Sequence, residues 1–121
     1  MKVLIVDDER DIRDSLEEFF RDEGFDVATA ANGDEALKQL EKTGEALPCA
    51  VLLDLFMPVL SGVEVYGRMQ QDARLRGVPV IISTSDPSRA PSGVLIMKKP
   101  IDLNRLLTVI KQTCAAPPAA L

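Results

Sequence analysis

Four short, almost purely apolar runs constrain the fold of this chain more than any other feature of its sequence. They lie at 3–6, 51–53, 80–82 and 94–97. Short runs rich in Val, Ile and Leu are typical of strands that are buried on both faces. A milder and more polar run at 26–30 is expected to form a strand at the edge of the same sheet.

Amphipathic patterns with helical spacing separate these runs. The first has Ile12, Leu16, Phe19 and Phe20 on one face, and Gly24 follows it as a stop signal. The other patterns are marked by Ala36, Leu37 and Leu40 before Gly44, by Val65, Met69 and Ala73 after the N-cap Ser61, and by Leu103, Leu106, Leu107, Ile110 and Cys114 after Asp102. Strands that alternate with helices predict an α/β fold with a parallel sheet covered on both faces.

The length of 121 residues fits one domain, and 46% hydrophobic residues can build a core without metal or disulfide staples. We expect the domain to occupy residues 1–114 and the small, proline-containing segment 115–121 to be a tail or the start of a linker. Cys49 and Cys114 lie far apart and lack the spacing of a metal site, so reduced core thiols are expected.

Charge and composition exclude several classes of function. The formal net charge is −5 and no basic patch is visible, so direct nucleic-acid binding is not expected. The apolar run at 3–6 is too short for a signal peptide or a membrane span, which indicates a cytoplasmic location. Histidine is absent, which excludes histidine-based triads, histidine general bases and the usual zinc sites.

Acidic side chains follow two of the predicted strands. Asp7 and Asp8 come directly after the run at 3–6, and Asp54 comes directly after the run at 51–53. Any one of them could equally start a loop or cap a helix. Open parallel sheets, however, bind ligands at the carboxyl ends of their strands, and clustered carboxylates repel unless a cation neutralises them. Together these acids favour a site for Mg²⁺ or Mn²⁺.

Thr84 and Lys99 follow the next two strands and complete a constellation that suits a phosphoryl group on Asp54. Such a group needs a metal, a hydroxyl donor and a fixed positive charge, which Asp8 with its metal, Thr84 and Lys99 would supply. Taken singly, Thr84 is more often an ordinary strand end and Lys99 a solvated charge. The joint occurrence favours the chemical interpretation.

The combination of these residues resembles the receiver domain of two-component response regulators. The matching strings are VLIVDDE at the start, DLFMP at 54–58, Gly62, PVIISTS at 79–85 and KKP at 98–100. The resemblance covers residues 2 to about 114. It implies a flavodoxin-like (βα)5 three-layer sandwich with the strand order 2-1-3-4-5, in which the acidic residues meet at the topological switch point.

The resemblance also implies the roles of the site residues. Asp54 would accept the phosphoryl group from a phosphohistidine of a sensor histidine kinase or a histidine phosphotransfer protein. Mg²⁺ would be bound directly by Asp8, Asp54 and the backbone carbonyl of Phe56, and by Asp7 mostly through water. The domain would act as a switch that signals to a downstream effector protein, and not as an enzyme in its own right.

The two remaining residues of the family's constellation would contact the phosphoryl group itself. Thr84 would bond one of its oxygens, and Lys99 would pair with the phosphate or with unmodified Asp54. The Lys99–Pro100 bond resembles the family's cis peptide bond, which would aim the lysine inward.

Two positions depart from the family's pattern. The family usually has Tyr or Phe three residues before the lysine, as a moving part of its switch, and this chain has Ile96. The segment 85–93 is short and contains Pro87 and Pro91, so we predict at most one helical turn there and a fourth helix that is reduced or absent. The family's common dimer surface would then be incomplete, and we expect a monomer or a weak dimer.

Three alternatives remain. A pseudo-receiver, a protein-interaction module that works without phosphorylation, would usually lack one or more of the five site residues that are all present here. A haloacid-dehalogenase-like phosphatase would have two aspartates separated by one residue after the first strand, whereas Asp7 and Asp8 are adjacent. A flavin-binding protein would have a loop rich in Ser, Thr and Gly at that position.

Overall fold

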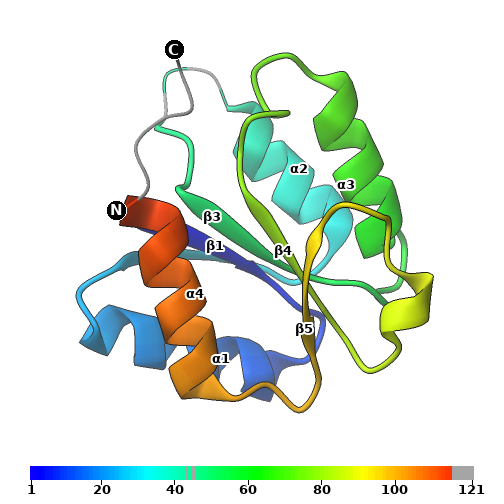
Figure 1. Ribbon diagram of the computed structural model, residues 1–121. Helices are drawn as coiled ribbons and strands as arrows, with labels where there is room; N and C mark the ends of the chain where they lie inside the picture. Colours follow the sequence, from blue (N-terminus) through cyan, green and yellow to red (C-terminus); the bar gives the residue numbers. More distant parts are fainter. Residues whose placement is uncertain (43, 45, 116–121) are drawn as a thin grey trace.

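The computed structural model describes residues 1–42, 44 and 46–115. Five parallel strands form one sheet in the order β2-β1-β3-β4-β5 (Figure 1). The strands are β1 Lys2–Val6, β2 Asp26–Ala30, β3 Ala50–Asp54, β4 Val80–Thr84 and β5 Leu95–Lys98. The helices are α1 Arg10–Asp22, α2 Gly33–Glu41, α3 Gly62–Gln71, the short 3₁₀ helix η1 Pro87–Arg89, and α4 Leu103–Ala115. This architecture confirms the predicted flavodoxin-like fold and its strand order.

Helices cover both faces of the sheet and divide the core into two layers. Because successive side chains of a strand point to opposite faces, Leu4 and Val6 pack with α2 and α3, whereas Val3 and Ile5 pack with α1 and α4. Figure 1 shows the two pairs of helices on either side of the sheet. The inner strands β1, β3 and β4 are almost entirely buried, which is why their sequences are nearly continuous apolar runs.

The predicted start and stop signals of the helices are largely confirmed. Ser61 caps α3 by accepting a hydrogen bond from the backbone N–H of Glu64, and Asp102 accepts from two backbone N–H groups in the first turn of α4. Gly24, with φ of +92°, follows the end of α1. Ala73 was expected on the third helix, but α3 ends at Gln71.

The segment 85–93 contains only the three-residue helix η1, as predicted from its prolines. The Asp86 carboxylate accepts a hydrogen bond from the backbone N–H of Ser88 at 3.2 Å and so closes the start of η1. No residue of η1 is buried, so this turn contributes little to the core and leaves the neighbouring edge strand β5 with less cover than a full helix would give.

The prediction of two reduced cysteines is wrong, because the structure contains a disulfide bond between Cys49 and Cys114. These cysteines are 65 residues apart in the sequence, but their Cα atoms lie 5.0 Å apart. Cys49 immediately precedes β3, and Cys114 lies in the last turn of α4. The last helix runs back across the sheet to the edge where the strands begin, and this return path is what brings the two residues together.

Two further observations concern the chain as a whole. No helix in the described part has both the length and the apolar character needed to cross a membrane. Of the predicted tail 115–121, Ala115 is the last residue of α4, and the rest lies outside the described residues.

Candidate functional site

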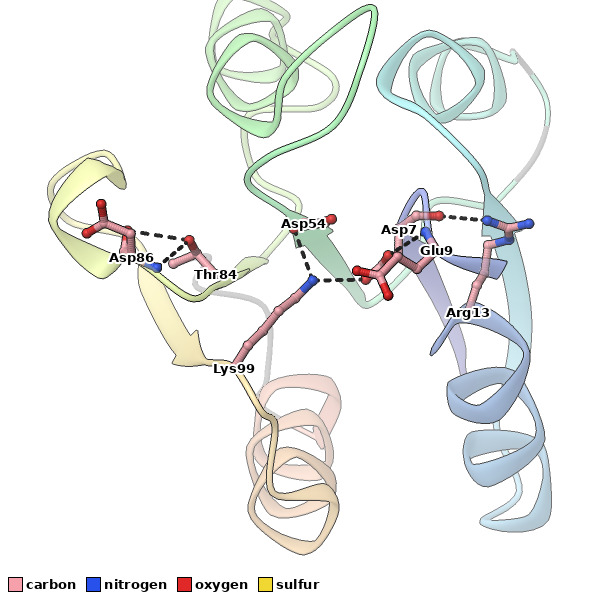
Figure 2. Close-up of polar contacts among 7 residues, drawn as sticks. All are labelled: Asp7, Glu9, Arg13, Asp54, Thr84, Asp86 and Lys99. Carbon is pink, nitrogen blue, oxygen red and sulfur yellow. Dashed lines mark hydrogen bonds and ion pairs between the residues drawn. The ribbon is translucent and has the colours of Figure 1, made fainter. Parts of the chain in front are cut away.

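The predicted site residues lie at the carboxyl ends of neighbouring strands. Asp7 follows β1, Asp54 is the last residue of β3, Thr84 is the last residue of β4, and Lys99 follows β5. Because β1, β3, β4 and β5 are consecutive neighbours in the parallel sheet, these residues share one edge (Figure 2). The topology therefore turns a set spread over most of the sequence into one local cluster.

Three carboxylates form the centre of this cluster. One oxygen from each of Asp7, Asp8 and Asp54 can be chosen so that all three lie within 4.8 Å of one another. Asp7 and Asp54 are buried, whereas Asp8 is exposed. Three oxygen donors without sulfur or imidazole suit a hard divalent cation, so the donor set fits Mg²⁺ or Mn²⁺.

Lys99 is the cation that the described residues provide inside this cluster. Its Nζ lies 3.3 Å from Oδ1 of Asp54 and 3.4 Å from Oδ2 of Asp7. Figure 2 marks both contacts with dashed lines. The Lys99–Pro100 peptide bond is cis, as the resemblance implied. Burial by itself would lower the pKa of Lys99, but the carboxylates of Asp54 and Asp7 outweigh it and raise that pKa above its ordinary value. The ammonium group is therefore a permanent positive charge.

Asp54 has an unusual protonation equilibrium. Burial raises the pKa of its carboxyl group to about 6, and the neighbouring Asp7 and Asp8 act in the same direction, while Lys99 opposes them. The carboxylate is thus still ionised in most molecules at neutral pH. Its charge nevertheless destabilises the fold when no cation other than Lys99 is bound.

Backbone contacts hold Asp7 in place. Its Oδ1 accepts a hydrogen bond from the backbone N–H of Glu9 at 2.9 Å, and its carbonyl oxygen accepts one from Nη1 of Arg13 at 2.8 Å (Figure 2). Arg13 lies on α1 and was not predicted from the sequence. An arginine on the polar side of an amphipathic helix is common, and nothing in its spacing marks it as part of a site.

Gly62 explains one of the sequence matches in physical terms. It is the first residue of α3, and a Cβ atom added there would lie 2.4 Å from the carbonyl oxygen of Asp54 and 2.9 Å from the Cα of Leu55. Backbone atoms cannot retreat from such contacts without moving the strand end, so only glycine fits. The start of α3 therefore packs directly on the backbone that carries the central carboxylate.

Thr84 lies at this edge as predicted, but its hydroxyl group is engaged elsewhere. The side chain is fully buried, and its Oγ1 accepts a hydrogen bond from the backbone N–H of Asp86 at 3.0 Å. Figure 2 shows this hydroxyl on the side that faces Asp86. Phe56 lies in the loop after β3 and is 45% exposed, and the metal-binding role of its carbonyl stays a prediction.

Fold and site together define an open, parallel α/β sheet with a cluster of three carboxylates at its topological switch point. A family model described as the response regulator receiver domain matches residues 3–111. The chain therefore belongs to the receiver domain family of two-component response regulators.

Individual relatives agree with this assignment. Response regulator Rre1 of Synechocystis is 31% identical over an alignment that covers 95% of this chain and 52% of Rre1, so the chain spans about half the length of that relative. Among solved structures, a putative response regulator from Chloroflexus aurantiacus has a TM-score of 0.85 and 30% identity, covering 95% of this chain and 98% of that one. The response regulator TrrA of Thermotoga maritima, solved in complex with Mg²⁺–BeF, has a TM-score of 0.78 and 30% identity, covering 93% and 97%.

Proposed function

We propose that this receiver domain accepts a phosphoryl group on Asp54 in an Mg²⁺-dependent reaction and thereby switches a signalling output in the cytoplasm. The donor is the phosphohistidine of a sensor histidine kinase or a histidine phosphotransfer protein, since this chain has no histidine of its own. The observation that carries the proposal is the buried Asp54 carboxylate, which lies beside Asp7 and Asp8 and has Nζ of Lys99 3.3 Å from its Oδ1. The domain acts as a switch, assisting its own phosphorylation and dephosphorylation.

The chemistry follows from this geometry. An oxygen of Asp54 attacks phosphorus, the P–N bond to the donor histidine breaks, and the electron pair leaves with the imidazole. Lys99 stabilises the negative charge on the transferred group, and its raised pKa keeps it protonated throughout. A divalent cation held by Asp8, Asp54 and the carbonyl of Phe56 would neutralise the phosphoryl oxygens. Asp7 would position that cation, and Thr84 would bond a phosphoryl oxygen.

Phosphorylation of Asp54 is tested with acetyl phosphate and Mg²⁺, followed by intact mass measurement. We expect one added phosphoryl group in the wild type, and none in Asp54→Asn, because an amide is a far weaker nucleophile than a carboxylate. Asp22→Asn, a change at the exposed end of α1, is the matched control and should be labelled like the wild type. Labelling of Asp54→Asn at the wild-type level would show that another residue is the acceptor.

Metal binding is tested with Asp8→Ala. Removal of one of three oxygen donors should weaken Mg²⁺ binding at least about tenfold, while relief of repulsion should leave the metal-free fold as stable as the wild type or more so. Mg²⁺ titration by NMR measures the first effect, and thermal melting in EDTA measures the second. Equal Mg²⁺ affinity in the two proteins would place the metal elsewhere.

A pseudo-receiver that binds partners without phosphorylation is the second candidate. Ile96 in place of the usual aromatic residue favours it, as does the reduction of the segment after β4 to the single turn η1. In that case the downstream effector would bind the unphosphorylated domain. The same acetyl phosphate experiment separates the two functions, since a pseudo-receiver takes no label under conditions in which a receiver does.

A further inference from the structure

Thr84 is held in a turn by the residue two positions further along the chain. Its Oγ1 accepts the backbone N–H of Asp86 at 3.0 Å and lies 3.4 Å from the carbonyl oxygen of the same residue. Because Thr84 is fully buried, this turn is the main polar contact that fixes the direction of its hydroxyl group. Because the hydroxyl group has one hydrogen to donate, it can bond a group on Asp54 only by giving up its contact with the carbonyl oxygen of Asp86.

Asp86 connects that turn to η1. Its Oδ1 accepts hydrogen bonds from the backbone N–H of Ser88 at 3.2 Å and from the Ser88 hydroxyl group, and its carbonyl oxygen accepts the backbone N–H of Arg89 at 3.3 Å. The same residue therefore holds Thr84 with its own N–H and holds η1 with its oxygens. A movement of Thr84 is thus transmitted to η1 over a single residue.

Arg89, the last residue of η1, ties this segment to the loop that follows β3. Its guanidinium carbon lies 5.9 Å from the centroid of the Phe56 ring, in a cation–π contact. Phe56 is two residues beyond Asp54 along the chain. The contacts therefore form a path from Thr84 through Asp86, η1 and Arg89 to Phe56, and both ends of the path lie beside the phosphoryl acceptor.

We propose that Asp86, η1 and the Arg89–Phe56 contact form a latch that holds the Thr84 hydroxyl away from Asp54, and that Arg89 is the positioning residue that sets the strength of the latch. The proposal rests on the proposed phosphorylation of Asp54. When Thr84 turns its O–H to a phosphoryl oxygen, it gives up the contact with the carbonyl oxygen of Asp86, which also accepts the N–H of Arg89, and η1 is released. The release of η1 would be the structural change that a partner protein detects. It would replace the movement of the usual aromatic residue, because this chain has Ile96 at that position.

The test measures the affinity of the protein for beryllofluoride in the presence of Mg²⁺. A contact that opposes the engaged form reduces the apparent affinity for any ligand that requires this form. An exposed cation–π contact is worth about 0.5–1 kcal/mol, so Arg89→Ala should bind beryllofluoride about two- to fivefold more tightly than the wild type. Phe56→Leu, which retains the backbone carbonyl, should give a similar gain, and the double variant should gain no more than either single change.

Arg76→Ala, an equal change of charge at an exposed position between α3 and β4, is the control and should leave the affinity unchanged. The backbone amide signals of Asp86 and Ser88 should shift on beryllofluoride binding in the wild type. Unchanged or weaker binding by Arg89→Ala would overturn the latch, as would additive gains in the double variant. Absence of beryllofluoride binding by the wild type would overturn the proposed function itself, and the latch with it.

Discussion

The end of the sheet where its strands finish differs from the end where they begin in the forces that act there. We call these two ends the carboxyl edge and the amino edge. At the carboxyl edge, one oxygen from each of three carboxylates lies within 4.8 Å of the others, Lys99 pairs with two of these carboxylates, and the pKa of Asp54 is raised to about 6. At the amino edge, a disulfide bond joins the chain before β3 to the last turn of α4. The carboxylates at the carboxyl edge repel one another, and a bound cation can reduce this repulsion. The amino edge is instead held together by a covalent bond.

This difference has a thermodynamic meaning. Ionised Asp54 lowers the free energy of unfolding, because its charge is less well solvated in the fold than in the unfolded chain. The disulfide raises that free energy by restricting the unfolded chain. The disulfide at the amino edge can thus offset the destabilisation caused by the ionised carboxylate of Asp54 at the carboxyl edge.

Removal of the disulfide is the strongest test of this comparison. A loop closed over 65 residues is expected to contribute about 4 kcal/mol to the free energy of unfolding by the chain-entropy model. Reduction with dithiothreitol, or the double change Cys49→Ser and Cys114→Ser, should therefore lower the stability measured by urea denaturation by about 2–5 kcal/mol.

The effect should be confined to stability. Acetyl phosphate labelling of the folded, reduced protein should match that of the oxidised protein, because the disulfide lies at the edge opposite to Asp54. The double serine variant should show no response to dithiothreitol. If the disulfide-free protein were as stable as the oxidised one, the disulfide would not stabilise the domain, and this half of the comparison would be wrong.

Most of the fold could be predicted because its strands are buried on both faces. Runs such as Val3–Val6 and 80–82 have no polar residue to accommodate, so their apolar character is continuous and easily recognised.

The site could be predicted for a related reason. Parallel strands bring their carboxyl ends to one edge, so polar residues such as Asp54 and Lys99 that follow strands must meet there.

The remaining features depend on three-dimensional packing that has no local signature. The pairing of Cys49 with Cys114 requires knowledge of where α4 ends relative to β3. The contact of Arg13 with the carbonyl oxygen of Asp7 depends on the angle at which α1 leaves the sheet. The direction of the Thr84 hydroxyl group depends on the turn at Asp86, which residue types alone do not specify.

Neutralisation of Asp54 tests the other edge and should have an intermediate effect. In the fold the pKa of Asp54 is raised to about 6 from an ordinary value of 3.8, so the folded protein binds this proton more tightly than the unfolded chain. The free energy of unfolding therefore falls as the pH rises from about 4 to about 6, and the loss is complete above that range. Asp54→Asn removes the ionisation and should stabilise the metal-free domain at pH 7.5 by about 2–3 kcal/mol, as the rise in the pKa of Asp54 from 3.8 to about 6 implies.

The measurement is urea denaturation in EDTA at several pH values. The gain from Asp54→Asn should be small at pH 4 and should vanish below the ordinary pKa of 3.8, where the wild-type carboxyl group is protonated in both states. Addition of Mg²⁺ at pH 7.5 should stabilise the wild type more than the variant, since the ion relieves the same repulsion. A variant less stable than the wild type at pH 7.5 without metal would show that Lys99 outweighs burial and the neighbouring acids.

The smallest expected effect comes from a residue of the carboxyl edge that is not part of the acidic cluster. Ser61 forms a capping box at the start of α3: its Oγ accepts the backbone N–H of Glu64 at 3.3 Å, and the Glu64 carboxylate accepts the backbone N–H of Ser61 at 3.2 Å. Ser61→Ala should lower the free energy of unfolding by about 1 kcal/mol, because one N–H of the first turn loses its partner. The loss should be the same at pH 5 and pH 7.5 and with or without Mg²⁺, in contrast to Asp54→Asn. The loss caused by Ser61→Ala could instead change with Mg²⁺ or pH, as the gain from Asp54→Asn is expected to. In that case the electrostatic repulsion would act over the whole carboxyl edge, and it could not be assigned to the three carboxylates and Lys99 alone.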